Sequence, residues 1–182
     1  MVRPKALPIT GFAACNFDGV AIDLVHQFKR GGALELARFM SEPMAAALAG
    51  GDLRANWANE AGTVNVAAVP SRPDSFRRRG FVPARLLVRA LVARLRRQGL
   101  DAREFTGVRL NRKVSDQALL NLQQRAANLA GAITVGPPPV PGTQLVLVDD
   151  VVTTGATIGE MYRAATESGW NCKFFVSFAE TL

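Results

Sequence analysis

The sequence is poor in cysteine and histidine, and this scarcity excludes several kinds of site. Its 182 residues include two cysteines, Cys15 and Cys172, and a single histidine, His26. Two cysteines far apart in the chain cannot form a disulfide framework, and without clustered His or Cys they cannot form a closed zinc site. A mechanism that requires two histidines is also excluded.

Long hydrophobic runs are absent as well. No stretch of about 18 apolar residues occurs, so the sequence predicts no transmembrane helix. Near the start, Pro8, Gly11, Asn16 and Asp18 interrupt the apolar residues, and no signal-peptide core is predicted. These absences indicate a cytoplasmic protein.

The composition is that of a folded domain. The chain is 48% hydrophobic and 20% charged, which is ordinary for a globular protein and excludes a disordered one. At about 150 residues per domain, its length predicts a single domain over residues 1–182. A domain of this size buries enough surface to need no disulfide or metal for stability. Within it we expect an N-terminal helical part, residues 1–63, and a core, residues 64–182.

Positive charge is concentrated in the middle of the chain. Between Arg72 and Arg125 lie 14 of the 22 Lys and Arg residues and only four acidic residues, so this segment carries a net charge of +10 against +7 for the whole chain. Such a segment predicts an anionic partner: phosphate, pyrophosphate or nucleic acid. The alternative is that the arginines of a helix over residues 86–97 form only a solvated helix face.

Apolar periodicity alternates between helix-like and strand-like segments. Helices are predicted over 20–28, 33–49, 84–98, 117–130 and 155–168, and strands over 64–69, 105–110, 145–148 and 173–178. The strands are apolar throughout rather than alternating, which is typical of a parallel sheet with helices on both faces. Ligands of such sheets bind outside the carboxyl ends of the strands. The sequence therefore predicts an α/β fold with its site at that edge.

The strongest chemical signal is the segment 145–157, LVLVDDVVTTGAT. A buried strand brings Asp149 and Asp150 to its carboxyl end, and a threonine-rich loop containing Gly155 leads into a helix. Amides at a helix start bind phosphate, and a glycine allows close backbone approach. The carboxylates would repel a phosphate, but they can accept hydrogen bonds from sugar hydroxyls or face a magnesium shell. The segment predicts a sugar-phosphate site, and an ordinary capped helix is the simpler alternative.

These thirteen residues resemble the phosphoribosyl pyrophosphate (PRPP) binding motif of the type I phosphoribosyltransferases. Three further segments resemble the ComF-type (late-competence) group of that family, in the same order along the chain. They are FKRG at 28–31, a VP…RRGF pattern at 69–81 and a Q…L…R…N pattern at 117–128. The resemblance covers roughly residues 18–180. It implies a type I phosphoribosyltransferase-like fold in which residues 64–182 form the PRPP-binding core.

The resemblance implies a role for each part of the site. Asp149 and Asp150 would act as the catalytic residues that hold the ribose hydroxyls, with Mg²⁺ carried by PRPP near them and no direct protein ligand. The 5′-phosphate would bind in the loop made of Val152, Thr153, Thr154, Gly155, Ala156 and Thr157.

Two further segments would complete the site. Pyrophosphate would meet the cationic loop that carries Arg72, Arg77, Arg78, Arg79 and Gly80, because guanidinium groups bind phosphate in a fork. A mobile loop would cover the site and exclude water, and its residues are Arg112, Lys113, Gln117 and Arg125. The alternative for this loop is an exposed basic turn.

The chain departs from the family pattern in three places. Ala156 stands where a second glycine is usual, and Val82 and Pro83 stand where Asn-Gln usually follow the Gly-Phe pair. Members of the family often carry a four-cysteine zinc finger, which the two cysteines of this sequence cannot form.

The resemblance implies an enzyme that transfers the 5-phosphoribosyl group from PRPP to a nitrogen acceptor, a nucleobase or an amine, and releases pyrophosphate. A non-catalytic PRPP- or nucleotide-binding regulator, or a DNA-uptake-associated protein, is the alternative. A single-stranded DNA binder ranks third, because only Phe76, Phe81 and Phe105 lie within the basic segment to stack on bases. The sequence leaves the acceptor and the oligomeric state, a homodimer included, open.

Overall fold

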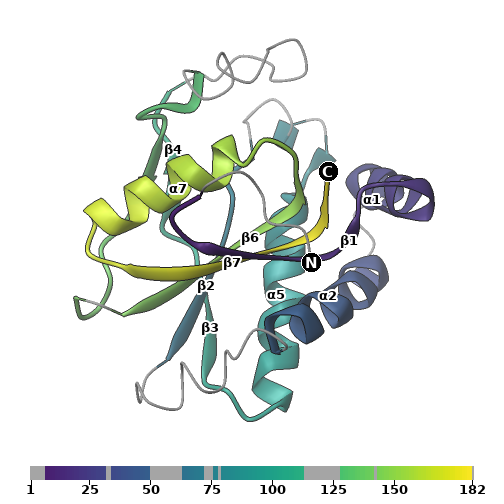
Figure 1. Cartoon of the computed structure of the whole chain (residues 1–182), viewed down its shortest axis with the longest axis horizontal. Helices are drawn as coiled ribbons and strands as arrows, with labels where there is room; N and C mark the ends of the chain where they lie inside the picture. The colour runs from purple at the N-terminus through teal and green to yellow at the C-terminus, as the bar shows by residue number, and fades with distance from the viewer. Residues whose placement is uncertain are drawn as a thin grey trace.

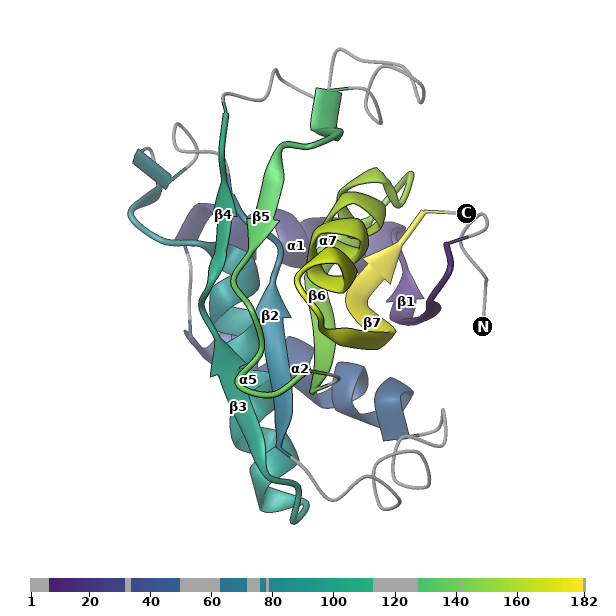
Figure 2. The same ribbon diagram turned by 90° about the vertical axis from the view of Figure 1, so that its left-hand side faces the viewer.

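A parallel β-sheet forms the centre of the molecule. The computed structural model describes residues 7–31, 34–49, 63–71, 76–77, 79–112, 128–141 and 143–181. Five strands lie in the order β1-β7-β6-β2-β3, and every neighbouring pair is parallel (Figures 1 and 2). Their bounds are β1 (Thr10–Asn16), β2 (Val64–Ala68), β3 (Ala102–Phe105), β6 (Gln144–Val152) and β7 (Asn171–Glu180). The predicted α/β fold with a parallel sheet is confirmed.

Helices cover both faces of this sheet. Helices α2 (Leu34–Ala49) and α5 (Pro83–Arg97) pack behind it in the view of Figure 2, and α7 (Ala156–Glu167) lies in front. Helix α1 (Gly19–Gly31) lies near the edge where the strands end. Because both faces are covered, the central strands are buried on both sides, and all five residues of β2 are buried. The apolar runs of the sequence therefore correspond to interior strands, as expected.

Local sequence explains where the helices begin and end. Helix α5 begins at Pro83, whose fixed backbone angle suits a first helical position, and the chain leaves it through Gly99 at φ +84°. Its buried stripe follows a spacing of four residues through Leu87, Leu91 and Leu95. The helices predicted over 20–28, 33–49, 84–98 and 155–168 are confirmed within one or two residues, except that α1 extends to Gly31. The helix predicted over 117–130 lies almost entirely outside the described residues.

The strand predicted over 105–110 is wrong in one respect, because the chain forms two strands there. Strand β3 ends at Phe105, and β4 (Val108–Leu110) pairs with β5 (Ile133–Val135) in a separate antiparallel ribbon. Gly107 lies at the break, where a Cβ atom would come within 2.5 Å of the Phe105 ring. The turn depends on this close approach, which the apolar pattern of the segment does not reveal.

Strands β1 and β5 are absent from the sequence-based prediction. In β1 only Phe12 is buried, and the strand is rich in small residues, so its hydrophobic signal is weak. It lies at the edge of the sheet beside β7, where a Cβ on Gly11 would come within 2.2 Å of the Phe175 ring. The stretch before residue 64 thus supplies a strand of the central sheet besides its helices.

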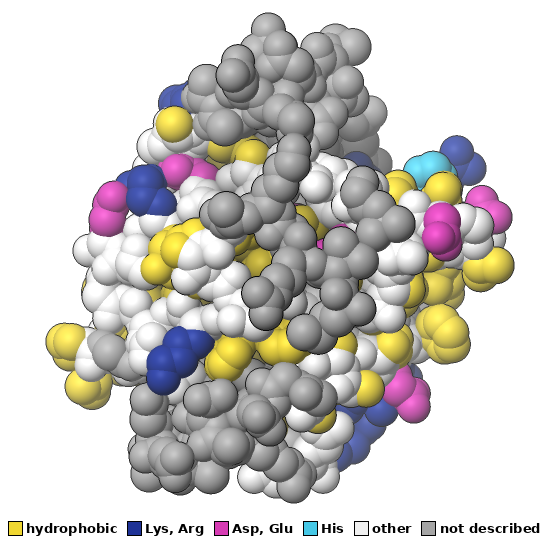
Figure 3. Space-filling view, viewed as in Figure 1, with side chains coloured by type: hydrophobic (Ala, Val, Ile, Leu, Met, Phe, Trp, Pro, Cys, Tyr) yellow, Lys and Arg dark blue, Asp and Glu magenta, His cyan; other side chains and the backbone are white. Residues whose placement is uncertain are grey.

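Helices α1 and α2 expose apolar side chains. Val20, Leu34 and Phe39 are exposed, and Figure 3 shows hydrophobic side chains on the side of the molecule that carries these helices. None of the helices in the described part of the chain has both the length and the apolar character that crossing a bilayer requires.

Candidate functional site

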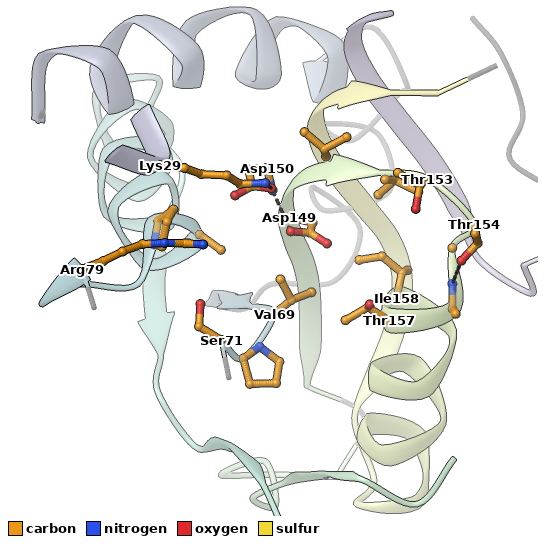
Figure 4. Close-up of a pocket in the computed structure, with 17 residues that line it drawn as sticks. Lys29, Val69, Ser71, Arg79, Asp149, Asp150, Thr153, Thr154, Thr157 and Ile158 are labelled. Atoms are coloured by element: carbon orange, nitrogen blue, oxygen red, sulfur yellow. Dashed lines mark hydrogen bonds and ion pairs between the residues drawn. The ribbon is translucent and has the colours of Figure 1, made fainter. Parts of the chain in front are cut away.

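A pocket of about 260 Å³ opens at the carboxyl edge of the sheet (Figure 4). The chain leaves β2 towards α5 and leaves β6 towards α7, and these helices lie on opposite faces of the sheet. Neighbouring strands whose connections diverge in this way leave a crevice between them, the usual ligand site of an open α/β sheet. The lining comes from α1 (Lys29), the segment after β2 (residues 69–71), the turn that precedes α5 (Arg79), the start of α5 (Pro83 and Ala84) and residues 149–158.

Asp149 and Asp150 end on opposite sides of the sheet, because successive residues of a strand alternate in direction. The Asp150 carboxylate meets the Lys29 ammonium, with 2.8 Å between Oδ1 and Nζ, and Asp150 is 7% exposed. Asp149 is half-buried, and its Oδ1 accepts a hydrogen bond of 2.8 Å from the backbone N–H of Asp150. Both residues line the pocket, as the sequence analysis expected of them.

Burial raises the pKa of the Asp149 carboxyl well above its ordinary value. The first cause is the loss of water around the group, and the second is the negative charge of Asp150. The Lys29 charge and the hydrogen bond from the Asp150 backbone act in the opposite direction but are the smaller effects. Asp149 therefore holds its proton more tightly than an exposed aspartate does.

The loop between β6 and α7 presents hydrogen-bond donors to the pocket. Gly155, at φ +74°, precedes the first residue of α7, a left-handed conformation that other residues rarely adopt. The N–H of Ala156 donates to Oγ1 of Thr154 at 3.2 Å. The first amides of a helix have no partner within the helix, and Thr157 and Ile158 belong to this turn and line the pocket. With the helix dipole behind them, these groups suit an anion such as a phosphate.

Positive side chains lie on the other side of the pocket. Figure 4 shows Lys29 and Arg79 facing the loop of Thr153 and Thr154 across Asp149 and Asp150. Arg79 belongs to a turn that closes at Gly80, whose N–H donates to the Phe76 carbonyl at 2.7 Å. Lys29 and Arg79 are the cations among the described residues of the lining, so the pocket has donors at both ends and carboxylates between them.

The residues of the predicted phosphate loop lie together in the pocket lining. All six of its residues line the pocket: Val152, Thr153, Thr154, Gly155, Ala156 and Thr157. Of the predicted pyrophosphate residues, Arg79 lines the pocket, whereas Gly80 and Arg77 are exposed and outside the lining. Arg72 and Arg78 lie outside the described residues.

The predicted covering loop is described only at its start. Arg112 is exposed, and its Nη2 donates to the Ala130 carbonyl at 3.0 Å, next to the β4–β5 ribbon. Lys113, Gln117 and Arg125 lie outside the described residues. Arg112 is not among the residues that line the pocket.

Sequence analysis did not assign Lys29 to the site. The FKRG segment was the available signal, but a lysine in the last turn of a helix is explained equally well by contacts with the helix's own carbonyl groups. The structure instead directs this side chain to a strand that lies more than a hundred residues later in the chain.

Many arginines of the basic segment are engaged with acidic side chains. Glu104 accepts hydrogen bonds from Arg85 at 3.0 Å and Arg89 at 3.1 Å, and Arg94 pairs with Glu42 at 3.2 Å. These ion pairs lie at the surface, where each contributes little to stability. The arrangement favours the interpretation of the α5 arginines as a solvated helix face.

Asp149 and Asp150 fit a magnesium ion that takes most of its ligands from elsewhere. Among the described residues, no group of three or more His, Cys, Asp or Glu side chains could hold a metal ion. Magnesium is commonly bound by one or two carboxylates together with water and ligand phosphate oxygens. The residues present therefore suit an ion that arrives with a phosphorylated ligand.

No protein-family model matches the sequence, and no curated protein matches it either.

Proposed function

We propose that this pocket binds PRPP and that the protein is a phosphoribosyltransferase of the type I, ComF-like kind. The observation that carries the proposal is the order of chemical groups across one pocket. Helix-start amides and threonine hydroxyls lie at one end, Asp149 and Asp150 in the middle, and Lys29 and Arg79 at the other end. A sugar with free hydroxyls and a phosphate group at each end matches this order.

Each end of PRPP has a complementary surface in this arrangement. The 5′-phosphate binds the loop of Thr153, Gly155 and Thr157, where backbone amides and side-chain hydroxyls can donate hydrogen bonds to the phosphate oxygens. The ribose hydroxyls donate to Asp149 and Asp150. The diphosphate lies on the side of Arg79, whose guanidinium can contact two phosphate oxygens at once.

The proposed reaction is a displacement at the anomeric carbon of the ribose. The bond from this carbon to the pyrophosphate oxygen breaks, and the oxygen keeps the electron pair. The lone pair of the acceptor nitrogen forms the new bond, and that nitrogen then loses its proton to solvent. Positive charge develops on the sugar ring, and the neighbouring carboxylates of Asp149 and Asp150 stabilise it, while Arg79 stabilises the leaving group.

Magnesium belongs to this proposal as a companion of the ligand. When bound, it would neutralise charge on the leaving pyrophosphate, and Asp149 and Asp150 are the residues that would lie beside it.

Calorimetric titration with PRPP and Mg²⁺, with ribose 5-phosphate as the comparison ligand, tests the binding step. We expect saturable binding of both ligands and loss of PRPP binding in the Asp149→Asn, Asp150→Asn double variant. Circular dichroism checks that this variant is folded. A wild-type protein that binds neither ligand, or a double variant that binds PRPP unchanged, would contradict the proposal.

A non-catalytic PRPP-binding regulator is the second candidate. Pro83 lines the pocket at the start of α5, where the family usually has a polar side chain. Turnover separates the two candidates, because an enzyme releases pyrophosphate when a suitable nitrogen acceptor is present, and a regulator binds PRPP without releasing it. Single-stranded DNA binding remains a third candidate, which steeply salt-dependent binding of an oligonucleotide would support. For each of these three candidate functions we propose that the protein is cytoplasmic.

A further inference from the structure

Lys29 lies in the last turn of helix α1, and its side chain extends to Asp150 in the pocket. Its Nζ lies 2.8 Å from Oδ1 of Asp150, and its side chain is 33% exposed. The residue also lines the pocket (Figure 4). The preceding residue, Phe28, is fully buried, as is Val25 one turn earlier. These two side chains anchor the end of α1, so the Lys29 side chain starts from a defined position.

Within the described part of the chain, the ion pair with Asp150 leaves two N–H donors of the Lys29 ammonium unused. A lysine carries three N–H donors, and the ion pair with Asp150 uses one of them. Lys29 has no other hydrogen bond to a described residue. Since a third of the side chain is exposed within a pocket lining, the remaining donors can reach a ligand.

The charges around this group are those of a binding site for a polyanion. Among the residues that the structure describes, the ionisable side chains that line the pocket are Lys29, Arg79, Asp149 and Asp150. Asp150 is buried and pairs with the ammonium, so it holds that group at the pocket surface. Arg79 adds a second positive charge on the same side of the pocket. Two cations close together are suited to a group that carries more than one negative charge.

We infer that Lys29 binds the diphosphate of the ligand directly, with Asp150 as the group that positions it. The inference rests on the proposed function and adds to it a residue that selects PRPP over ribose 5-phosphate. It also makes α1 part of the binding site, since the helix supplies one of the two cations.

A purely structural role for Lys29 would give a different result. If the lysine only neutralised Asp150, its loss would disturb the carboxylate that receives the ribose hydroxyls. Ribose 5-phosphate and PRPP share that contact, so both would then bind more weakly by the same factor. If the lysine contacts the diphosphate, its loss should weaken the binding of ligands that carry a diphosphate and leave the binding of ribose 5-phosphate nearly unchanged.

The experiment compares Lys29→Gln with wild type by titration with PRPP, ribose 5-phosphate and inorganic pyrophosphate, each with Mg²⁺. Loss of one charge-assisted contact should raise the Kd for PRPP and for pyrophosphate about 10- to 100-fold. The Kd for ribose 5-phosphate should rise by less than about 3-fold, within the range of a weak indirect effect. Lys29→Arg should recover part of the affinity. Arg30→Gln, an exposed neighbour outside the pocket lining, is the matched control and should bind as wild type does.

Equal weakening of PRPP and ribose 5-phosphate in Lys29→Gln, or no weakening of pyrophosphate binding, would overturn the inference. A wild-type protein that binds no PRPP would instead overturn the proposed function, and the inference with it. If Lys29→Gln fails to fold because Asp150 loses its partner, the comparison moves to an Asp150→Asn background with pyrophosphate as the ligand. There, Lys29→Gln should weaken pyrophosphate binding about 10-fold, and equal affinities would refute the contact.

Discussion

The backbone N–H of Asp150 donates a 2.8 Å hydrogen bond to Oδ1 of Asp149, so the first carboxylate of the pair turns back on its own strand. The Asp150 carboxylate points to the other side of the sheet, where it pairs with Lys29. Two neighbours in sequence therefore serve different purposes. Asp149 forms no ion pair with a residue that the structure describes, whereas Asp150 pairs with Lys29.

Asp149→Asn should stabilise the protein at neutral pH. The pKa of Asp149 is raised in the folded state, so the folded protein binds more protons than the unfolded chain between the ordinary aspartate value of 3.8 and the raised value. Stability then falls as pH rises through this window, because ionisation is disfavoured only in the folded state. Asparagine keeps the acceptor oxygen for the Asp150 amide and removes the charge.

Thermal unfolding of wild type and Asp149→Asn between pH 3 and pH 8 measures this effect. The variant should have the higher Tm near neutral pH, and the difference should shrink towards zero below the ordinary aspartate pKa of about 4. Asp23→Asn, a change at an exposed position of α1, is the control and should show no comparable gain. A variant less stable than wild type at neutral pH would contradict the assigned cause.

Arg79→Ala should weaken ligands that carry a diphosphate more than it weakens ribose 5-phosphate. Arg79 lines the pocket opposite the phosphate loop, so its guanidinium faces only one end of the ligand. The loss of its charge-assisted hydrogen bonds should raise the Kd for PRPP at least about 10-fold in a calorimetric titration. Arg103→Ala is the control, because Arg103 is exposed at the start of β3, pairs with Asp101 and does not belong to the pocket lining. Equal losses for both ligands would argue against a diphosphate contact.

Gly155→Ala should destabilise the loop that precedes α7. The backbone of Gly155 has φ +74°, and a Cβ atom there would lie 3.2 Å from Cδ1 of Leu7. The left-handed conformation alone costs an alanine about 1–2 kcal/mol, and a shift of the loop would also weaken ribose 5-phosphate binding. Chemical denaturation and titration measure the two effects.

Gly159→Ala is the matched control for this change. A Cβ at Gly159 lies the same 3.2 Å from the Leu7 side chain, but Gly159 is inside α7 and has no positive φ. Alanine is the better helix former by about 1 kcal/mol, so this variant should be as stable as wild type or more so. If both variants lose stability equally, the contact with Leu7 rather than the backbone conformation is the cause.

Trp170→Phe should destabilise the fold without changing the pocket. The indole N–H donates to the Gly136 carbonyl at 2.7 Å, and the ring packs edge-on against Phe105 with 4.7 Å between centroids. Phenylalanine keeps most of the packing but leaves a half-buried carbonyl without this donor, at a cost of about 1 kcal/mol. Denaturant unfolding should show this loss, while PRPP affinity stays unchanged. Tyr162→Phe, on a half-buried ring of α7, should alter stability far less.

Segments with a strong local pattern were predictable from the sequence. The apolar run at 145–148 identified β6, and the spacing of Leu87, Leu91 and Leu95 identified α5. Strand β1 could not be found in this way, because its small residues lack an alternating pattern and its pairing partner β7 lies at the other end of the chain. The break between β3 and β4 depends on the fit of Gly107 against Phe105, a contact that no periodicity records.

The sequence by itself determined the α/β class and placed two carboxylates and a Thr/Gly loop at the end of a buried strand, because these features depend on residues next to one another. Only the tertiary structure decided which cations join them. Lys29 and Arg79 come from separate parts of the chain, and they reach the pocket because α1 and the turn before α5 lie at the edge where β2 and β6 end. Asp149 owes its raised pKa to the same packing, since burial and the nearby charge of Asp150 arise only when the strand is enclosed.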